Sequence, residues 1–304
     1  MTTLAVETEG LAKVYGLLTA VDHISFDVRA GEVFALLGPN GAGKTTTIRM
    51  LTGLTRPTSG QARVLGLDLS RDLPRIKKQV GVVPERSNLY DELTARDNLL
   101  FIAALYGVPR REREARADGL LRRFRLEEKR DAPFARLSRG MKRALTVAAA
   151  LIHRPRLIFL DEPTVGLDVV SARGLRALIE RLREEGVTIF LTTHYMEEAE
   201  RLADRVALLV QGGVVALDTV ENLKACVQRG ATVEAHLAGA VMGEERLRFH
   251  GESVEAALHI ALAHAKAEGK RMVSMNTLQP TLEDAFIQLT ELSAEVMLAE
   301  KGGR

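Results

Sequence analysis

A glycine-rich stretch carries the clearest chemical signal in the chain. Residues 38–45 read Gly-Pro-Asn-Gly-Ala-Gly-Lys-Thr, which fits the pattern G-x-x-x-x-G-K-[ST]. In such a loop the glycines let backbone N–H groups surround phosphate oxygens, Lys44 adds a positive charge, and Thr45 offers a hydroxyl to Mg²⁺. The residues predicted to bind phosphate are Gly38, Pro39, Asn40, Gly41, Ala42, Gly43, Lys44, Thr45 and Thr46.

The sequence on both sides of this loop supports the prediction. Residues 33–37 are all apolar and end at Gly-Pro, as expected for a buried parallel strand. The residues from Thr45 onward can begin a helix, whose first N–H groups and positive dipole end would face the loop. A glycine-rich turn that binds nothing is the alternative, and the correct flanks argue against it. We therefore predict a nucleotide-binding site.

Two adjacent carboxylates, Asp161 and Glu162, follow the apolar run 157–160. Open α/β sheets bind ligands at the carboxyl ends of their strands, so the pair is expected close to the phosphate loop. Two buried carboxylates without a cation would be costly in free energy. Asp161 is suited to hold Mg²⁺ beside Thr45. Glu162 points elsewhere and is suited to act as general base on the attacking water.

Two further side chains have less specific signals. His194 follows another strand-like run, 187–191. A lone histidine is more often structural. Its position at a strand end near the acids nevertheless favours a functional role, in which it would form a hydrogen bond to the γ-phosphate and to the attacking water. Tyr15 lies upstream of the loop, where an aromatic ring can stack on adenine. It can equally pack as an ordinary strand tyrosine, and spacing alone leaves both interpretations open.

The rest of the chain shows how these residues are positioned. Strand-like and helical segments alternate up to residue 217, which predicts an α/β fold whose mainly parallel sheet is covered on both faces. The first 37 residues read as several strands, and residues 206–217 as a hairpin. Beyond Asp218 we expect a small α+β appendage without a catalytic pattern, with strands near 231–235, 246–249 and 272–275 and a helix over 254–262.

Composition restricts the function classes. The 304 residues suffice for one large and one small domain, and a net charge of +2 gives no reason to expect a nucleic-acid partner. No apolar run approaches the roughly 18 residues of a membrane helix, and no signal-peptide pattern is evident. Cys226, the single cysteine, excludes an internal disulfide and is expected to be a small packed side chain. These features predict a cytoplasmic protein.

Three more stretches make the phosphate loop specific. Ser138 and Gly140 lie in the run Leu-Ser-Arg-Gly-Met at 137–141, before the acidic strand, and Asp168 ends a Gly-Leu-Asp run just after it. Glu85 follows another short apolar run, 80–84. In this order, together with the phosphate loop and His194, the motifs resemble the ATP-binding cassette of ABC transporters over about residues 4–217.

The resemblance implies a fold, cofactors and a partner copy. The fold is a P-loop nucleoside-triphosphatase with a RecA-like core, N-terminal antiparallel strands and an inserted helical subdomain at about 86–150, all within a domain 1–217. Residues 218–304 would form an accessory domain. The cofactors are ATP and Mg²⁺. Ser138 and Gly140 would contact the γ-phosphate of ATP held by the opposite subunit, with Asp168 across the same interface, so a head-to-tail homodimer is expected.

Two departures from the family pattern concern activity. Glu85 stands where glutamine is usual; its carboxylate can still ligand Mg²⁺ with Thr45 and Asp161, but it adds negative charge near the γ-phosphate. Arg139 and Met141 stand where glycine and glutamine are usual. We interpret these differences as the mark of a subfamily of exporter cassettes with C-terminal extensions. Residues 281–286 resemble the tail of drug-resistance-type exporter ATPases.

The hypothesis that follows is the ATP-hydrolysing subunit of an ABC exporter, peripheral on the inner face of the cell membrane. Residues between Glu85 and Ser138 would contact a separate polytopic membrane subunit. The arginine-rich segment 110–131 is either a solvated helical surface or a face for anionic lipid or an acidic partner. A non-transport ABC ATPase and a slow-turnover regulator are alternatives. A metabolic kinase is disfavoured, because residues 137–141 and His194 would then have no role.

Overall fold

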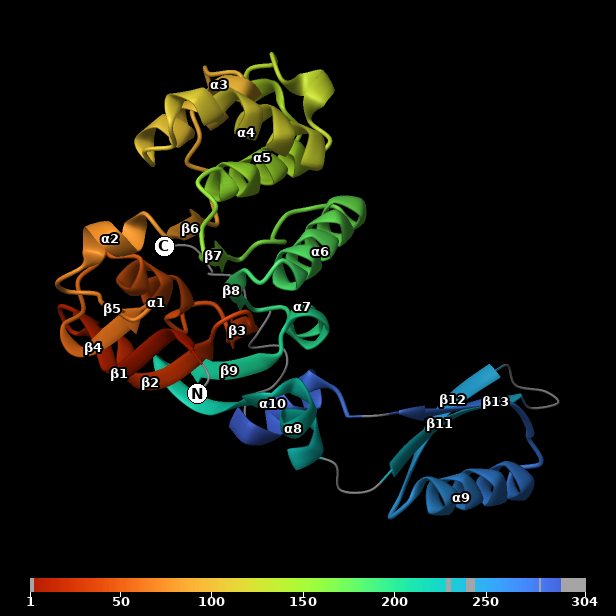
Figure 1. Ribbon diagram of the computed structural model, residues 1–304. Helices are drawn as coiled ribbons and strands as arrows, with labels where there is room; N and C mark the ends of the chain where they lie inside the picture. Colours follow the sequence, from red (N-terminus) through yellow and green to blue (C-terminus); the bar gives the residue numbers. More distant parts are fainter. Residues whose placement is uncertain (1–2, 228–230, 239–243, 279, 291–304) are drawn as a thin grey trace. The chain divides into compact units, whose positions relative to one another are not determined.

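The computed structural model describes residues 3–227, 231–238, 244–278 and 280–290. These residues divide into two compact units, one extending to Thr219 and the other beginning at Val220 (Figure 1). Each unit contains buried hydrophobic clusters. In the described part of the chain, no helix combines the length and apolarity needed to cross a membrane.

A six-stranded sheet is the centre of the first unit. Its strand order is β10-β9-β3-β8-β7-β6, and all neighbours are parallel except the β9–β10 hairpin. Every residue of the three central strands β3, β8 and β7 is buried, which explains the apolar runs that these strands contain. The strands are β3 (Val33–Leu37), β6 (Val80–Val83), β7 (Leu157–Asp161), β8 (Thr188–Thr193), β9 (Arg205–Val210) and β10 (Gly213–Thr219).

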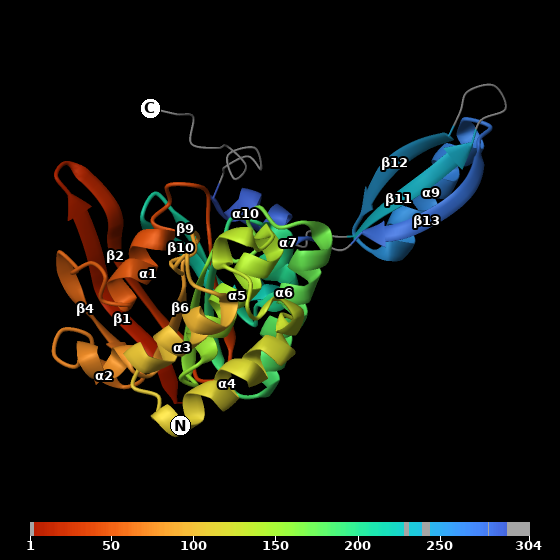
Figure 2. The ribbon, with the colours of Figure 1, turned by 90° about the horizontal axis from the view of Figure 1, so that it is seen from above.

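A second, antiparallel sheet of order β2-β1-β4-β5 stands beside the first (Figure 2). The strands are β1 (Leu4–Tyr15), β2 (Leu18–Arg29), β4 (Ser59–Val64) and β5 (Leu67–Asp68). Phe26 of β2 stacks on Phe34 of β3 with ring centroids 5.4 Å apart, and Phe34 contacts Phe190 at 5.3 Å. The core between the sheets also takes in α1 (Lys44–Leu51) and Ile76 of α2 (Leu73–Lys77).

A helical group with its own core lies between β6 and β7 in the sequence. It contains α3 (Ala95–Leu105), α4 (Arg110–Arg123), the 3₁₀ turns η1 (Glu127–Lys129) and η2 (Phe134–Arg136), and α5 (Arg139–Leu151). Leu99, Leu121 and Leu145 pack together with Phe134 in this core. After β7, helix α6 (Val169–Glu184) contacts β8, and α7 (Met196–Leu202) contacts β3.

The second unit is a small sheet with helices. Strands β11 (Ala231–Ala238), β12 (Glu244–Gly251) and β13 (Arg271–Leu278) form an antiparallel sheet of order β12-β11-β13, which packs against α9 (Val254–Ala267). Val233, Ala235 and Leu237 alternate along β11 and are fully buried. Helix α10 (Leu282–Thr290) contacts α8 (Val220–Cys226).

One expectation about this unit is wrong. Cys226 is exposed at the end of α8 and is not a packed core side chain. The buried residues of α8 are Val220 and Leu223, which share one helix face three residues apart. Cys226 is the last residue of this short helix and is exposed although it lies three residues after Leu223.

Candidate active site

The phosphate loop connects β3 to α1, and three of its glycines satisfy strict backbone requirements. Gly41 and Gly43 have φ of 84° and 109°, in a region that other residues rarely adopt. A Cβ at Gly43 would lie 2.4 Å from the carbonyl oxygen of Ala20, and one at Gly38 would lie 2.1 Å from that of Leu209. No side chain caps the first turn of α1. The dipole and backbone of this helix start therefore suit an anionic ligand.

Lys44 lies at the centre of the site and is only 5% exposed. Its ammonium group makes three polar contacts there. It donates hydrogen bonds to the carbonyl oxygens of Gly38 and Pro39 at 2.7 and 3.1 Å. It also forms an ion pair with Oε1 of Glu162 at 3.1 Å. The amine thus joins the phosphate loop to the strand that carries the acids.

Asp161 ends β7 beside the loop, as the strand order requires. Its Oδ1 accepts hydrogen bonds from the hydroxyls of Thr45 at 3.2 Å and Thr192 at 2.6 Å. A carboxylate and a hydroxyl are hard oxygen donors, and Mg²⁺ sites in nucleotide enzymes commonly use one or two carboxylates with substrate phosphates. The Thr45–Asp161 pair therefore fits Mg²⁺.

Glu162 is held in an unusual backbone conformation. Its φ is 46°; for a residue other than glycine this conformation costs on the order of 1–3 kcal/mol and persists only where the surroundings fix it. The Glu162 N–H donates to the carbonyl oxygen of Thr192 at 3.1 Å and to its hydroxyl at 3.2 Å. This conformation directs the carboxylate to Lys44 on one side and to Nδ1 of His194, 2.9 Å away, on the other.

Opposing influences set the charge of Glu162. Burial of the side chain raises its pKa, whereas the hydrogen bond from His194 and the charge of Lys44 lower it, and the net result is a pKa below the ordinary value of 4.5. The carboxylate is therefore ionised at neutral pH. It can accept a proton, as a general base must.

Ser138, Gly140 and Asp168 form a second group at the start of α5 and α6. The Ser138 hydroxyl accepts from the N–H of Met141 at 3.3 Å and caps α5. Asp168 caps α6 by accepting from the N–H and hydroxyl of Ser171 at 2.9 and 2.7 Å, and these bonds lower its pKa. A Cβ at Gly140 would lie 2.3 Å from the Ser171 hydroxyl oxygen, so the two helix starts approach closely here.

The two remaining predicted residues lie at exposed positions. Glu85 follows β6 with its side chain exposed. Tyr15 ends β1, and its ring is 45% exposed with the Lys13 ammonium 4.8 Å from the ring centroid. The Tyr15 ring therefore lies outside the core, with the Lys13 ammonium over one of its faces.

Sequence reasoning missed two residues that shape this site. Thr192 forms hydrogen bonds with both Asp161 and Glu162. In the sequence, the only indication of this role is the pair Thr192 and Thr193 at the end of a predicted strand. Arg143 of α5 donates to the main chain of the same acidic segment, yet nothing in its spacing separates it from the other arginines of the chain.

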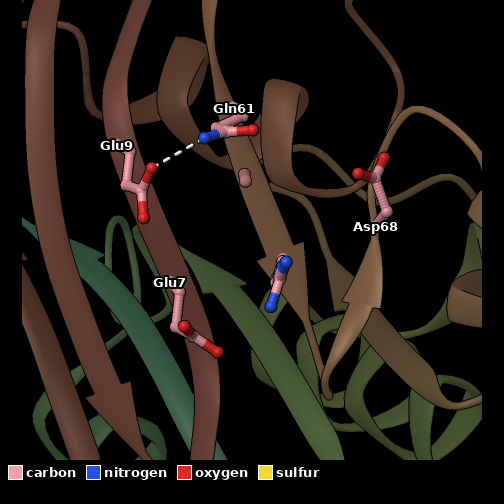
Figure 3. A pocket seen from close by; sticks show the side chains of 6 residues that line it. Glu7, Glu9, Gln61 and Asp68 are labelled. Atoms are coloured by element: carbon pink, nitrogen blue, oxygen red, sulfur yellow. Dashed lines mark hydrogen bonds between the residues drawn. The ribbon is translucent and has the colours of Figure 1, made fainter.

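A small hollow elsewhere in the unit contains none of these residues. Its lining includes Glu7, Glu9, Gln61 and Asp68 on strands β1, β4 and β5, and its volume of about 40 Å³ leaves room for only a few waters (Figure 3). Glu9 accepts a hydrogen bond from Gln61 at 2.7 Å. A groove of about 750 Å³ adjoins it and shares Gln61 and Asp68.

The phosphate loop, the acids after β7 and the histidine after β8 together define a P-loop nucleoside-triphosphatase. The family described as ABC transporter matches residues 21–165. The linearmycin resistance ATP-binding protein of Bacillus subtilis (strain 168) is 36% identical, covering 93% of this chain and 97% of that protein. The Nod factor export ATP-binding protein I of Mesorhizobium japonicum is 38% identical, covering 95% and 87%.

Solved structures agree with this classification. An ATP-binding subunit of an ABC transporter is 34% identical with a TM-score of 0.67, covering 73% of this chain and 92% of that one. A dimeric ATP-binding cassette in a post-hydrolysis state, bound to ADP and Pi, is 25% identical with a TM-score of 0.66, covering 70% and 98%. The chain belongs to the ATP-binding proteins of ABC transporters. It is the ATP-hydrolysing subunit of an exporter-type transporter.

Proposed function

We propose that this chain drives export through a separate polytopic permease, and that two copies close head to tail around two ATP molecules. The observation that carries the proposal is the convergence of Lys44, Asp161, Glu162 and His194 from α1, β7 and the end of β8. Lys44 binds the outer phosphates, Glu162 accepts a proton from the attacking water, and His194 holds Glu162 and the water in line.

Mg²⁺ is the proposed metal. Thr45 and Asp161 would hold it, and its charge would neutralise the phosphates. Glu85 is a further proposed oxygen ligand, from the loop after β6. The nucleotide contacts of residues 38–46, and the stacking of adenine on Tyr15, are part of the same proposal.

In the proposed dimer, the residues at the starts of α5 and α6 would face the ATP that is bound to the partner copy. Ser138 and Gly140 begin α5 and Asp168 begins α6, on elements other than the phosphate loop. Next to Asp168, Val169 and Val170 are 79% and 80% exposed. Two adjacent, almost fully exposed valines suit an interface that forms only when the partner copy binds.

The permease is proposed to bind the helical group, with the chain on the inner face of the membrane. Tyr90, Phe101 and Leu105 expose large apolar side chains there, and the Tyr90 and Phe101 rings meet edge to face at 5.1 Å. The arginines of α4 are a weaker candidate surface, because Arg116 and Arg123 pair with Glu112 and Glu185 of the same chain. Residues 218–304 are proposed as an accessory domain.

A co-purification experiment tests the proposal. Tagged Glu162→Gln protein, expressed with its chromosomal neighbours and solubilised with ATP present, should bring down a polytopic membrane protein in stoichiometric amount. The control combines Glu162→Gln with Lys44→Ala, which weakens nucleotide binding and should reduce the recovery that depends on ATP. A soluble dimer with no membrane partner would instead support a non-transport ABC ATPase.

A further inference from the structure

Arg143 makes an unusual number of contacts for one side chain. From the third position after Gly140 on α5, its guanidinium donates to five backbone carbonyl oxygens. Nε donates to Pro163 at 2.9 Å, and Nη2 donates to Asp161 at 3.0 Å and to Glu162 at 3.2 Å. Nη1 donates to Pro84 and, at 3.3 Å, to Glu85. All five acceptors are main-chain atoms, so these bonds fix the path of the backbone.

These five bonds join three separate segments. The first is α5, which begins with Ser138 and Gly140. The second is the turn after β6, at Pro84 and Glu85, and the third is the turn after β7, from Asp161 to Pro163. Arg139 lies four residues before Arg143, on the same side of α5. Its Nη1 donates to the carbonyl oxygen of Gly166, 3.0 Å away, in the segment that follows β7.

The left-handed conformation of Glu162 is fixed from both sides of the residue. Thr192 accepts the hydrogen bond of its N–H, and Arg143 donates to its carbonyl oxygen. Backbone conformations of this kind persist only where neighbours enforce them. In this conformation the Glu162 carboxylate meets both Lys44 and His194.

We propose that Arg143 is a positioning residue for ATP hydrolysis. By tying the Asp161–Pro163 backbone to α5 and to the turn after β6, it aims Glu162 at the attacking water. A displacement of α5 is then passed directly to Glu162. The inference rests on the proposed role of Glu162 as general base, and the test below separates the two.

The test compares Arg143→Lys and Arg143→Gln in the full-length protein. Lysine keeps the positive charge, but its donors are all on one nitrogen atom. It therefore cannot donate to the five carbonyl oxygens that the planar guanidinium of Arg143 contacts. Displacing a catalytic group by about 1 Å can cost about 100-fold in rate. We expect kcat to fall roughly 10- to 100-fold, more for Gln than for Lys. The Kd for a fluorescent ATP analogue should change less than about threefold, because the five carbonyl acceptors of Arg143 lie outside the phosphate loop.

Arg116→Lys is the matched control. Arg116 also donates from a partly buried guanidinium to a backbone carbonyl, that of Ile152 at 3.0 Å, near the opposite end of α5. We expect Arg116→Lys to lose thermal stability as Arg143→Lys does. Its kcat should stay within about twofold of the parent value, since the Arg116 hydrogen bond to Ile152 is remote from the turn at Asp161–Pro163. An equal loss of kcat in both variants would mean that Arg143 acts only through stability and would overturn the proposal.

A double-mutant comparison identifies the group through which Arg143 acts. In single-turnover assays, Arg143→Lys should add little to the loss caused by Glu162→Gln, because the base it positions is already gone. Multiplicative losses, or an Arg143→Lys kcat within twofold of the parent, would refute the positioning role. Hydrolysis by Glu162→Gln at the parent rate would instead refute Glu162 as the base, whatever the Arg143 variants do.

Discussion

Glu162 shows how two neighbours set the chemistry of one side chain. His194 and Lys44 contact its two carboxylate oxygens, and together they lower its pKa by more than burial raises it. The same contacts hold the carboxylate 8% exposed, so it is both ionised and shielded from bulk solvent. A nucleophilic water bound there would meet a base that is already deprotonated.

The lowered pKa predicts how stability depends on pH. A carboxylate whose folded pKa lies below its unfolded value stabilises the protein above the unfolded pKa, near 4.5, and this contribution is lost as pH falls through the folded pKa. The difference in melting temperature between the parent and Glu162→Gln should therefore stay constant from pH 7 to about pH 5 and diminish only below that. Thermal scans at intervals of half a pH unit would measure it. A difference that already diminishes between pH 7 and 6 would show that burial prevails and the pKa is raised.

How well the sequence predicts a residue depends on whether its partners are local. Lys44, Asp161 and His194 follow from short motifs at strand ends, and the structure places them together. Arg143 could not be found this way, because its five acceptors lie on two turns that only the fold brings to α5. The prediction that Cys226 is packed is wrong, because the residue type alone does not determine whether other elements cover the end of a helix.

At the scale of elements, the starts of α5 and α6 depend on each other. Both are capped by residues of the predicted interface group, Ser138 and Asp168, a structural role that the motif alone did not reveal. The helices and strands themselves were easier to predict, since β3, β7 and β8 each contain an apolar run that is buried on both faces of the sheet. The close contact at Gly140 follows from packing and has no sequence signal.

That contact predicts the effect of Gly140→Ala. The added Cβ would lie 2.3 Å from the Ser171 hydroxyl oxygen, so Ser171 must rotate and give up its hydrogen bond to Asp168. We expect a loss of about 1 kcal/mol in the free energy of unfolding, the typical contribution of one such bond. Chemical denaturation would measure it.

Ser171→Ala provides the matched comparison for Gly140→Ala. It removes the same hydroxyl, so the double variant should be destabilised less than the sum of the single variants. Strictly additive losses would indicate that the two helix starts do not touch at this point.

At the scale of the whole molecule, each unit contains buried apolar clusters. The sheets and helices up to Thr219 form two of the clusters that the structure describes, and Leu237, Ala261 and Ala265 belong to a cluster within the second unit. All the residues proposed to act on ATP belong to the first unit. The second unit therefore has no proposed part in the chemistry itself.

A chain ending at Thr219 should accordingly fold and hydrolyse ATP within about threefold of the full-length rate, because it keeps every predicted catalytic residue and the two buried clusters described above for the first unit. A chain ending at Val210 is the control: it loses β10, which pairs with β9 beside the phosphate-loop strand, and it should fail to give soluble protein. Steady-state ATPase assays on purified protein would decide. If the Thr219 chain folds but is inactive, residues beyond it contribute to turnover, and that contribution would have to be sought in pairing of the two copies.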